Sequence, residues 1–224
     1  VIKLGGAVLN TENAAKALFD VLSEQKNNEF VIVHGGGSLV DTWLKQAGFA
    51  SAKHQGLRIS PAEQMPVGLS LFEAGVTATQ KLKALCLVGK CKSNDDSIIS
   101  DLLKIGRLPI VSSIGFDEQG LWYNVNADEA AAAIASNLNA ELIFMTDVEA
   151  VLDANKQPLH QLDTKHIDTL ITDGVIVGGM EVKVKTSLHA AQHLRRGVYI
   201  SSWQKPENLT ALLQDEHVGT KITP

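Results

Sequence analysis

The sequence lacks the features that would place it among disulfide-rich, metal-binding or membrane proteins. Its two cysteines, Cys86 and Cys91, are too few for a disulfide framework, and one C-x4-C pair is not a zinc site. Its seven histidines show neither H-x-H nor H-E-x-x-H spacing, so we assign no metal to protein ligands. No apolar run approaches the ~20 residues that a membrane-spanning helix needs. We therefore expect reduced thiols and a cytoplasmic location.

An excess of basic charge is also missing. The chain has 20 Lys and Arg against 25 Asp and Glu, which gives a formal net charge of −5 at pH 7. No basic face is needed to reach this balance, which argues against a general binder of nucleic acid or of a membrane surface. Any anionic ligand must therefore be held by a local site.

The hydrophobic pattern is typical of an α/β protein with a mainly parallel sheet. Short apolar runs alternate with amphipathic helical segments along most of the chain. We expect strands at residues 1–4, 30–33, 108–114 (buried), 142–146 and 198–201, with a hairpin over 116–125. We expect helices at about residues 11–22, 39–44, 95–103, 127–138 and 179–194. No internal repeat or linker is visible, and a soft division near residues 114–124 separates two halves.

Three consecutive glycines, Gly35, Gly36 and Gly37, stand where a predicted strand passes into a helix. They belong neither to a G-x-x-x-x-G-K-[ST] loop nor to a G-x-G-x-x-G fingerprint. A single glycine would suit a tight turn, but three in a row cost more conformational entropy than a turn requires. Backbone N–H groups at a helix N-terminus, with no side chains in the way, form an anion site. Gly5 and Gly6 would lie at the same sheet edge, where open α/β sheets bind ligands.

Three lysines occupy positions that need an explanation. Lys3 lies inside the apolar strand VIKLGG, where a lysine is usually an edge residue or extends its charge to solvent. Because it is close to the glycines, it could equally reach a phosphate. Lys183 and Lys185 lie in the first turns of a predicted helix, where the macrodipole favours acids. Either both are solvated at a small cost, or a bound anion offsets the penalty.

Other polar residues have plain structural interpretations. Asn126 or Asp128 would serve as a cap for the helix that follows. His34 is most simply the end of a strand. Arg58 is an isolated arginine whose guanidinium could hold a carboxylate in two places. The sequence contains no Ser-His-Asp set or nucleophile elbow.

Seven motifs taken together resemble a known family. They are VIKLGG, VIVHGGGSLVD, GLR, LPIVSSIG, NVNADEAA, DVEAVLD and GGMEVKV, in this order over nearly the whole chain. The set resembles the N-acetylglutamate kinases, which are members of the amino acid kinase family. The HGGG and NVNAD forms are more similar to these enzymes than to carbamate kinases, aspartokinases or uridylate kinases.

The resemblance implies a fold and an activity. The fold would be a three-layer α/β/α sandwich around one open, mainly parallel sheet. Residues 1–114 would bind N-acetyl-L-glutamate and form a homodimer, and residues 115–224 would bind ATP with Mg²⁺. The reaction would phosphorylate the side-chain carboxylate of N-acetyl-L-glutamate to N-acetylglutamyl 5-phosphate, in arginine biosynthesis.

The resemblance also implies roles for individual residues. Lys3 and Lys183 would stabilise the transferring phosphoryl group, with Asp128 between them to orient both. The residues implied for the acceptor are Gly36 and Gly37 through their backbone, Arg58 through the α-carboxylate, and Asn124. The residues implied for the nucleotide pocket are Asp147, Val148, Glu149, Ala150, Val151, Leu152, Val175, Ile176 and Val177.

This scheme is chemically reasonable without a general base. The nucleophile is a carboxylate with a pKa near ~4.3, which is already ionised at pH 7. The difficulty is that an anionic acceptor must approach a polyphosphate, so catalysis depends on positioning and on positive groups aimed at the equatorial oxygens. Mg²⁺ is expected to arrive mainly on the nucleotide and to keep several waters, so we name no protein ligand for it.

The chain departs from the family in three places. Family members carry roughly two dozen more residues where this chain joins Met65 and Pro66 to Val67, more than a typical connection, so we expect a missing segment there. A family turn rich in glycine and aspartate is replaced by residues 71–75, which leaves the hairpin region 67–92 uncertain. Arginine-regulated family members carry an extra N-terminal helix that makes hexamers; none is visible before Val1, so we expect a dimer without arginine inhibition.

Two alternatives stay open. The same fold could act on carbamate, aspartate or a nucleotide monophosphate, or it could be a non-catalytic ligand-binding module. Arg58 in its GLR context favours an amino-acid acceptor with a free α-carboxylate. The presence of Lys3, Lys183 and Asp128 favours a working enzyme.

Overall fold

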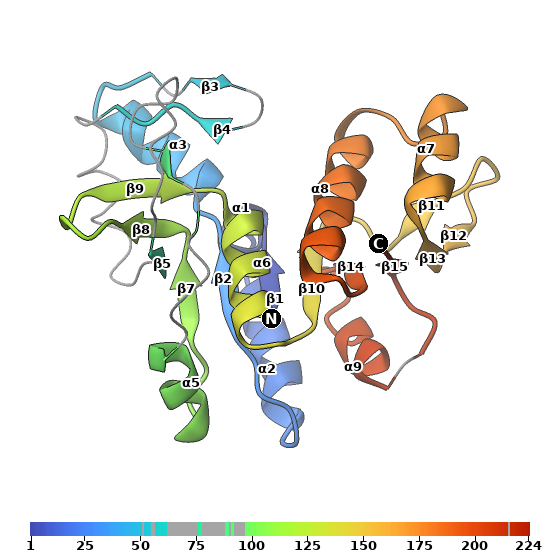
Figure 1. The fold of residues 1–224 in the computed structure, drawn as a ribbon, viewed down its shortest axis with the longest axis horizontal. Helices are drawn as coiled ribbons and strands as arrows, with labels where there is room; N and C mark the ends of the chain where they lie inside the picture. The colour runs from blue at the N-terminus through green and yellow to red at the C-terminus, as the bar shows by residue number, and fades with distance from the viewer. Residues whose placement is uncertain are drawn as a thin grey trace.

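The computed structural model describes residues 1–50, 52–54, 57–61, 76–77, 88–89, 91, 97–214 and 216–224. Within these residues, a seven-stranded sheet with the order β13-β15-β14-β10-β1-β2-β7 forms the centre of the fold (Figure 1). Five neighbouring strands, β14, β10, β1, β2 and β7, are parallel to one another. The other two, β15 and β13, are parallel to each other and run antiparallel to these five, since β15 pairs antiparallel with β14. The strands of this sheet are β1 (Ile2–Leu4), β2 (Ile32–His34), β7 (Ile110–Ser112), β10 (Leu142–Thr146), β13 (Gln161–Leu162), β14 (Val198–Ser202) and β15 (Thr220–Ile222).

Helices cover both faces of this sheet. Within the described residues the helices are α1 (Gly6–Asn10), α2 (Ala14–Glu24), α3 (Gly37–Gln46), α5 (Ser97–Lys104), α6 (Ala127–Asn137), α7 (Thr164–Thr172), α8 (Gly178–Leu194) and α9 (Asn208–Leu213). Buried side chains of α6, α7 and α8 pack with one face of the strands, and those of α1, α2 and α9 pack with the other face. The expected three-layer α/β/α sandwich is therefore confirmed.

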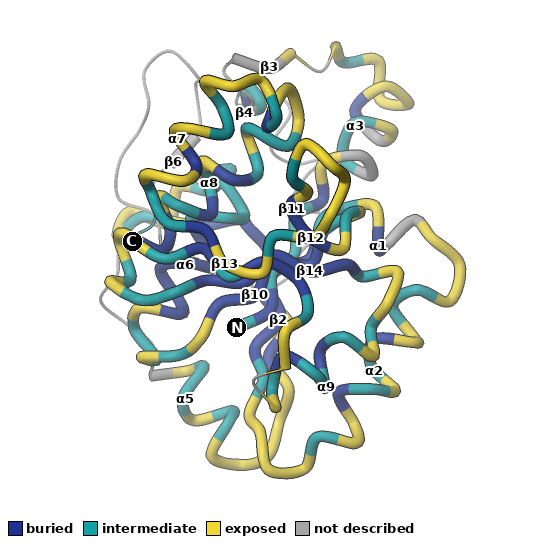
Figure 2. Tube along the Cα trace, turned by 90° about the vertical axis from the view of Figure 1, so that its right-hand side faces the viewer, coloured by how far each residue is buried: buried dark blue, intermediate teal, exposed yellow. Residues whose placement is uncertain are grey.

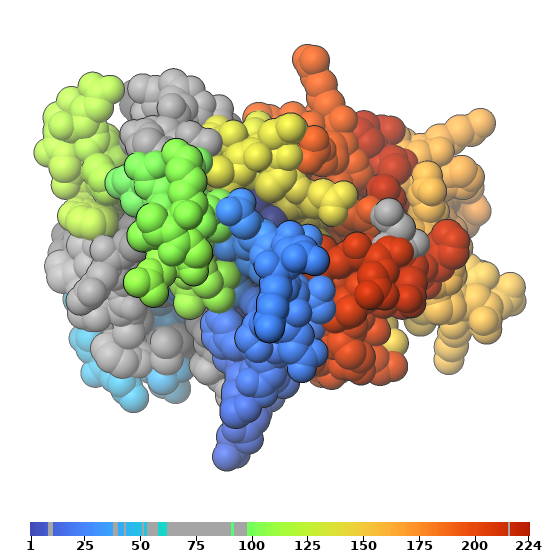
Figure 3. Space-filling model, turned by 90° about the horizontal axis from the view of Figure 1, so that it is seen from below, coloured from blue at the N-terminus to red at the C-terminus, as the bar shows by residue number. Residues whose placement is uncertain are grey.

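The two core clusters explain why these segments fold as they do. Residues 130–135 of α6 are five alanines and Ile134, all buried, and such small side chains let the helix approach both the sheet and α8 closely. On the other face, Leu18 and Leu22 of α2 pack with Leu209 and Leu212 of α9. In Figure 2 the buried residues follow the central strands, whereas the outer helices and turns are largely exposed. Seen from below in Figure 3, the blue surface of α2 adjoins the red surface that contains α9.

Smaller strands complete the fold. A four-stranded sheet has the order β5-β8-β9-β6, and two further pairs are β3–β4 and β11–β12. Their bounds are β3 (Lys53–His54), β4 (Leu57–Arg58), β5 (Val76–Thr77), β6 (Val88–Gly89), β8 (Ile114–Phe116), β9 (Trp122–Val125), β11 (Val151–Leu152) and β12 (Pro158–Leu159). The predicted hairpin over 116–125 is confirmed as the antiparallel pair β8–β9. Its turn is closed by Asp117, which accepts hydrogen bonds from the backbone N–H groups of Gln119 and Leu121.

One predicted strand is wrong in detail. The expected buried strand over 108–114 is two shorter strands, β7 and β8, in different sheets. Ile110 is 49% exposed, because β7 is the edge strand of the seven-stranded sheet within the described residues. The five-residue helix α1, directly after Gly5, was not predicted.

Several sequence predictions lie outside the described residues. These are the junction from Met65 to Val67, the replacement at residues 71–75, most of the hairpin region 67–92, and the helix start at Asp95 and Asp96. Of the helices in the part of the chain that is described, none combines the length and the apolar character that a membrane crossing would require.

Candidate active site

The candidate site lies at the carboxyl ends of neighbouring parallel strands. The strands β14, β10, β1 and β2 are consecutive in the sheet, and the chain order reverses between β10 and β1. Open α/β sheets bind ligands at such a switch point, because the loops from the two strands diverge and leave a crevice. The residues that follow these strands are Trp203 after β14, Asp147 after β10, Gly5 after β1 and Gly35 after β2.

Lys3 is a residue of a central strand. It pairs through its backbone with Phe144 of β10 on one side and Val33 of β2 on the other, so the edge-strand interpretation of this lysine is wrong. Because side chains alternate along a strand, Ile2 and Leu4 enter the core on the α2 side and Lys3 points to the α6 side. A charge at this depth needs a partner.

That partner is Asp128 in the first turn of α6. Lys3 Nζ lies 2.8 Å from Asp128 Oδ1, and the two side chains are only 19% and 27% exposed. Asn126 caps the helix, since its Oδ1 accepts hydrogen bonds from the backbone N–H groups of Asp128 at 2.7 Å and Glu129 at 3.4 Å. The capping interpretation is therefore confirmed for Asn126, and the cap fixes the backbone that presents the Asp128 carboxylate to Lys3.

Lys183 has a different carboxylate as its partner. It lies on α8, and its Nζ donates to Asp147 Oδ1, at the first residue after β10. The hydrogen bond from Lys183 is the main cause that holds the pKa of Asp147 below its ordinary value. Among the described residues, Lys183 is thus paired with Asp147 rather than with Asp128. The pair is more open than the first, with side chains 31% and 62% exposed.

The two pairs line one cavity of about 340 Å³, which we call the donor cavity. The other residues that line it are Gly5, Gly6, Ala7, Phe144, Met145, Thr146, Val182, Thr186, Ser187 and Trp203. Two lysines and two carboxylates cancel in formal charge. No group of three or more Cys, His, Asp and Glu is placed to hold a metal ion in the part of the chain that is described.

The loops that follow β1 and β2 contain glycines, and the structural requirement for glycine differs from one position to the next. A Cβ on Gly35 would lie 3.3 Å from Cβ of Ala127, so close packing of the loop against α6 explains this glycine. A Cβ on Gly5 or Gly37 would meet no described atom within 4 Å, and neither residue has a positive φ. Packing and backbone conformation therefore do not require glycine at Gly5 and Gly37. A physical reason for glycine at these two positions is that the absence of a side chain leaves space for a ligand close to the backbone.

Arg58 is held beside the triple glycine. Its Nη2 donates to the backbone oxygen of Gly37 at 2.8 Å, and its Nη1 forms an ion pair with Asp41 of α3. The side chain is only 10% exposed. The structure thus brings together two residues predicted for the acceptor, Gly37 and Arg58. Asn124 lies on β9, opposite Ile114, and Gly36 is buried directly before α3.

The residues predicted for the nucleotide fall into two groups. Asp147 lines the donor cavity, and Glu149 forms an ion pair with Lys205 at 2.9 Å that raises the pKa of Lys205. The side chains of Ala150, Val151 and Ile176 are buried in the core, so only their backbone could face a ligand.

The remaining members of this predicted set are at the surface or near it. Val148 exchanges hydrogen bonds with Thr146, since its N–H donates to Thr146 Oγ1 and its carbonyl accepts from the same hydroxyl. Leu152 and Val177 are exposed. Val175 donates its N–H to the backbone oxygen of Leu170, which ties the segment before α8 to α7.

Sequence reasoning missed Thr186, Ser187 and Trp203 in the donor cavity. Thr186 lies one helical turn after Lys183, so helical spacing from a candidate lysine could have found it. Trp203 directly follows β14, and its backbone N–H donates to Thr146 at 3.0 Å. An aromatic residue just past a predicted strand end was a usable signal.

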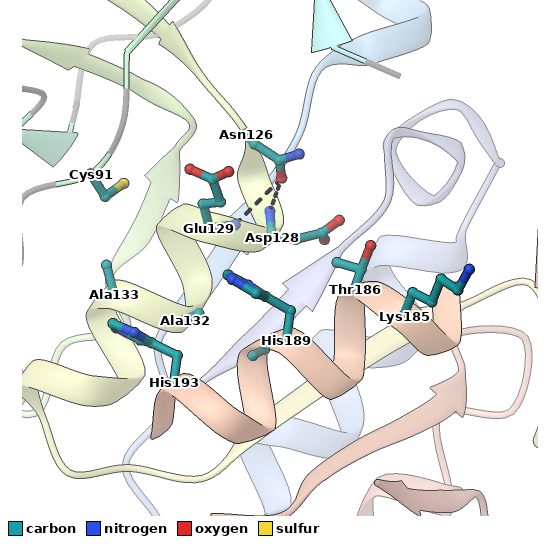
Figure 4. Close-up of a pocket in the computed structure, with 11 residues that line it drawn as sticks. Cys91, Asn126, Asp128, Glu129, Ala132, Ala133, Lys185, Thr186, His189 and His193 are labelled. Atoms are coloured by element: carbon teal, nitrogen blue, oxygen red, sulfur yellow. Dashed lines mark hydrogen bonds between the residues drawn. The ribbon is translucent and has the colours of Figure 1, made fainter. Parts of the chain in front are cut away.

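A second cavity of about 450 Å³ lies beside the first, between α6 and α8 (Figure 4). Asp128 and Thr186 line both cavities. His189 and His193 of α8 point toward α6 in Figure 4. Cys91 also lines this cavity, and burial raises the pKa of its thiol to about 12, so the thiol is neutral at physiological pH.

The fold and the site together define a class of protein. Its members are α/β/α proteins in which two lysines from different elements lie in one cavity, at the point in the sheet where the strand order reverses. Residues 1–202 match the model of the amino acid kinase family, and the chain belongs to that family.

Curated relatives narrow the comparison. The chain is 43% identical over 250 residues to the acetylglutamate kinase of Colwellia psychrerythraea, and the alignment covers 100% of this chain and 96% of that protein. It is 42% identical to the acetylglutamate kinase of Moritella abyssi over 251 residues, with 100% and 95% covered. These alignments are longer than the 224 residues of this chain, so the relatives carry residues without a counterpart here.

Solved structures share the fold. N-acetylglutamate synthase from Neisseria gonorrhoeae, complexed with coenzyme A and N-acetyl-glutamate, matches with a TM-score of 0.82 at 17% identity, over 100% of this chain and 58% of that one. The protein smu.665 from Streptococcus mutans matches with a TM-score of 0.75 at 24% identity, over 99% and 97%. A carbamate kinase from Giardia matches with a TM-score of 0.69 at 16% identity, over 99% and 97%. At these identities the likeness concerns the fold alone.

Proposed function

We propose that the protein transfers the γ-phosphoryl group of ATP to the side-chain carboxylate of N-acetyl-L-glutamate, which yields N-acetylglutamyl 5-phosphate for arginine biosynthesis. The relatives that are 42–43% identical over the full chain are acetylglutamate kinases. The structural observation that carries the proposal is that Lys3 of β1 and Lys183 of α8 meet in one cavity at the switch point of the sheet.

The chemistry needs positive charge more than it needs a base. The acceptor carboxylate is ionised at neutral pH, so it attacks phosphorus without losing a proton. Charge on the equatorial oxygens of the transferring group must be balanced while two anions approach each other. Lys3 and Lys183 are the described cations of the donor cavity, and Asp128 holds Lys3 in place. Hydrogen-bond donors fixed before the reaction cost no reorganisation during it.

The donor would enter from the half formed by residues 115–224. There, Asp147 and the backbone of residues 148–152 and 175–177 would line the nucleotide, while the phosphates reach Lys3 and Lys183. Nucleotide-bound Mg²⁺ would neutralise part of the polyphosphate charge. The residues present fit a metal carried by phosphates and water, because the described residues contain no group of three or more His, Cys, Asp and Glu placed to hold a metal ion by themselves.

The acceptor would be held in the half formed by residues 1–114, with Asn124 as a further contact. Gly36 and Gly37 would donate backbone N–H groups, and Arg58 would bind the α-carboxylate beside them. Arg58 is well placed for this because Asp41 and the Gly37 carbonyl orient its guanidinium. We further propose that this half forms a homodimer and that the protein acts in the cytoplasm.

The test is ATP consumption with Mg²⁺ against a panel of acceptors, with hydroxylamine added to trap an acyl phosphate as its hydroxamate. We expect hydroxamate with N-acetylglutamate and none with glutamate, aspartate or carbamate. Turnover with a different acceptor, and silence with N-acetylglutamate, would overturn the assignment of the Arg58 pocket.

A further inference from the structure

We propose that Asp147 is an exchangeable counter-ion: its carboxylate competes with the polyphosphate of the donor for Lys183 and is displaced when the phosphates bind. The inference rests on the proposed function, since it assumes that a polyphosphate reaches Lys183. It assigns to Asp147 a role that works against nucleotide affinity, in contrast to a residue that only lines the pocket.

The first observation is the position of the pair. Asp147 is the first residue after β10, and Lys183 lies on α8, so the ion pair joins two separate elements that both line the donor cavity. The Asp147 side chain is 62% exposed. An exposed carboxylate that turns away from Lys183 is hydrated at once, so its release leaves no buried charge without a partner.

The second observation is the contrast with Asp128. That carboxylate is mostly buried with Lys3, and the Asn126 cap fixes the helical turn that carries it. Removing Asp128 from Lys3 would leave a partly buried charge uncompensated, which is costly. One lysine of the donor cavity therefore has a fixed partner, and the other has a partner that can leave.

The third observation is the charge balance. With both pairs formed, the two lysines and two carboxylates of the donor cavity cancel, which gives a polyphosphate no net attraction. When Asp147 moves toward solvent, Lys183 can pair with the phosphate instead. The same movement takes the negative carboxylate away from the negative phosphate. Both effects have the same sign, so the presence of Asp147 lowers the affinity for polyphosphate.

The experiment measures binding of inorganic tripolyphosphate to the full chain by calorimetry at fixed ionic strength. This probe has no ribose or base, so contacts that Asp147 makes to a nucleoside cannot obscure the result. We expect Asp147→Asn to bind it about three- to tenfold more tightly than the wild type, since exposed ion pairs have modest strength. Asp147→Ala, which removes the hydrogen-bond acceptor as well, should tighten binding at least as much.

A matched control separates this effect from a general loss of negative charge. Glu181 forms an ion pair with Lys185 at 2.6 Å on the same helix, and neither residue lines the donor cavity. Glu181→Gln removes the same unit of charge two residues from Lys183, so it should leave tripolyphosphate affinity within about twofold of the wild type. Equal tightening in Glu181→Gln and Asp147→Asn would overturn the proposal.

A double-mutant cycle completes the test. In a Lys183→Met background the gain from Asp147→Asn should shrink to the part that comes from like-charge repulsion, because no cation is left for the carboxylate to withhold. Weaker or unchanged tripolyphosphate binding in both Asp147 variants would show that Asp147 is not a competitor, and so would the absence of measurable binding to any variant. The acceptor is absent from this assay, so its outcome is independent of whether N-acetylglutamate is phosphorylated.

Discussion

The donor side and the acceptor side of the candidate site hold their charges in different ways. On the donor side, Lys3 and Lys183 come from β1 and α8, and each is paired with a carboxylate from another element. On the acceptor side, Arg58 is tied to Asp41 and to the Gly37 carbonyl, so the guanidinium is oriented by groups close to the glycine loop. A transferring phosphoryl group needs positive charge from several directions, because its charge is spread over three equatorial oxygens. A carboxylate that does not react needs only a fixed, planar fork.

This comparison is tested most strongly by removing a donor-side cation. Lys183→Met should lower kcat by about 10²- to 10³-fold, because it removes the charge that we propose stabilises the transferring phosphoryl group. Steady-state kinetics with N-acetylglutamate and ATP would measure the effect.

Lys185→Met is the matched control for that change. Lys185 lies two residues further on the same helix and pairs with Glu181, and it lines the second cavity but not the donor cavity. Its loss should change kcat by less than about twofold, as for other exposed ion pairs. Similar losses in both variants would mean that the helix, rather than the donor cavity, is sensitive to charge.

The acceptor side should respond in KM rather than in kcat. Arg58→Lys keeps the charge and removes the planar fork, so we expect the KM for N-acetylglutamate to rise about 10- to 100-fold. The KM for ATP should stay close to that of the wild type, because Arg58 does not line the donor cavity in the described part of the chain. A change of equal size in both KM values would contradict the division into two sides.

The central strands and the hairpin could be predicted from the sequence because their signals are local. Apolar runs at the β10 and β14 positions, and the turn at Asp117, depend on neighbouring residues alone. The exposure of Ile110 could not be predicted in this way, because an edge strand is a property of the order of strands in the sheet. The five-residue helix α1 was missed because it is too short to show a period.

The residues of the candidate site could likewise be predicted from the sequence only in part. The motifs could indicate that Lys3, Asp128 and Lys183 belong to one site, and the structure brings them to one cavity. Which carboxylate holds which lysine depends on geometry across the switch point. Asp147 and Lys183 are 36 residues apart in the chain, and no periodicity relates them. The open space above Gly37 likewise becomes visible only once the fold is known.

Substitutions of Gly35 and Gly37 in the triple-glycine loop should have smaller effects than the loss of Lys183 or of the Arg58 guanidinium. Gly37→Val should raise the KM for N-acetylglutamate by about tenfold or more with little change in Tm, because its side chain would enter the space over the loop, where a Cβ meets no described atom within 4 Å. Gly35→Ala should instead lower the free energy of unfolding by about 1–3 kcal/mol, since the added methyl group presses on Ala127. Thermal unfolding and acceptor KM, measured on both variants, separate the two reasons. A Gly37→Val variant that loses stability as much as Gly35→Ala would mean that the loop is structural throughout.

The smallest expected effect compares a helix cap beneath the site with one away from it. Asn126→Ala removes the cap of α6, and Asp163→Ala removes the cap of α7, where Asp163 Oδ1 accepts from the backbone N–H of His166 at 2.9 Å. Each change should lower the free energy of unfolding by about 1 kcal/mol, which is typical for the loss of a cap.

Their kinetic effects should differ although their stability effects are alike. Only the α6 cap fixes the turn that presents Asp128 to Lys3, so Asn126→Ala should lower kcat several-fold and Asp163→Ala should leave it unchanged. Thermal unfolding at matched protein concentration, followed by kcat well below both midpoints, would measure the two effects separately. Equal kcat values in the two variants would mean that Lys3 itself positions Asp128, and that the first turn of α6 contributes stability without contributing to the order of the donor cavity.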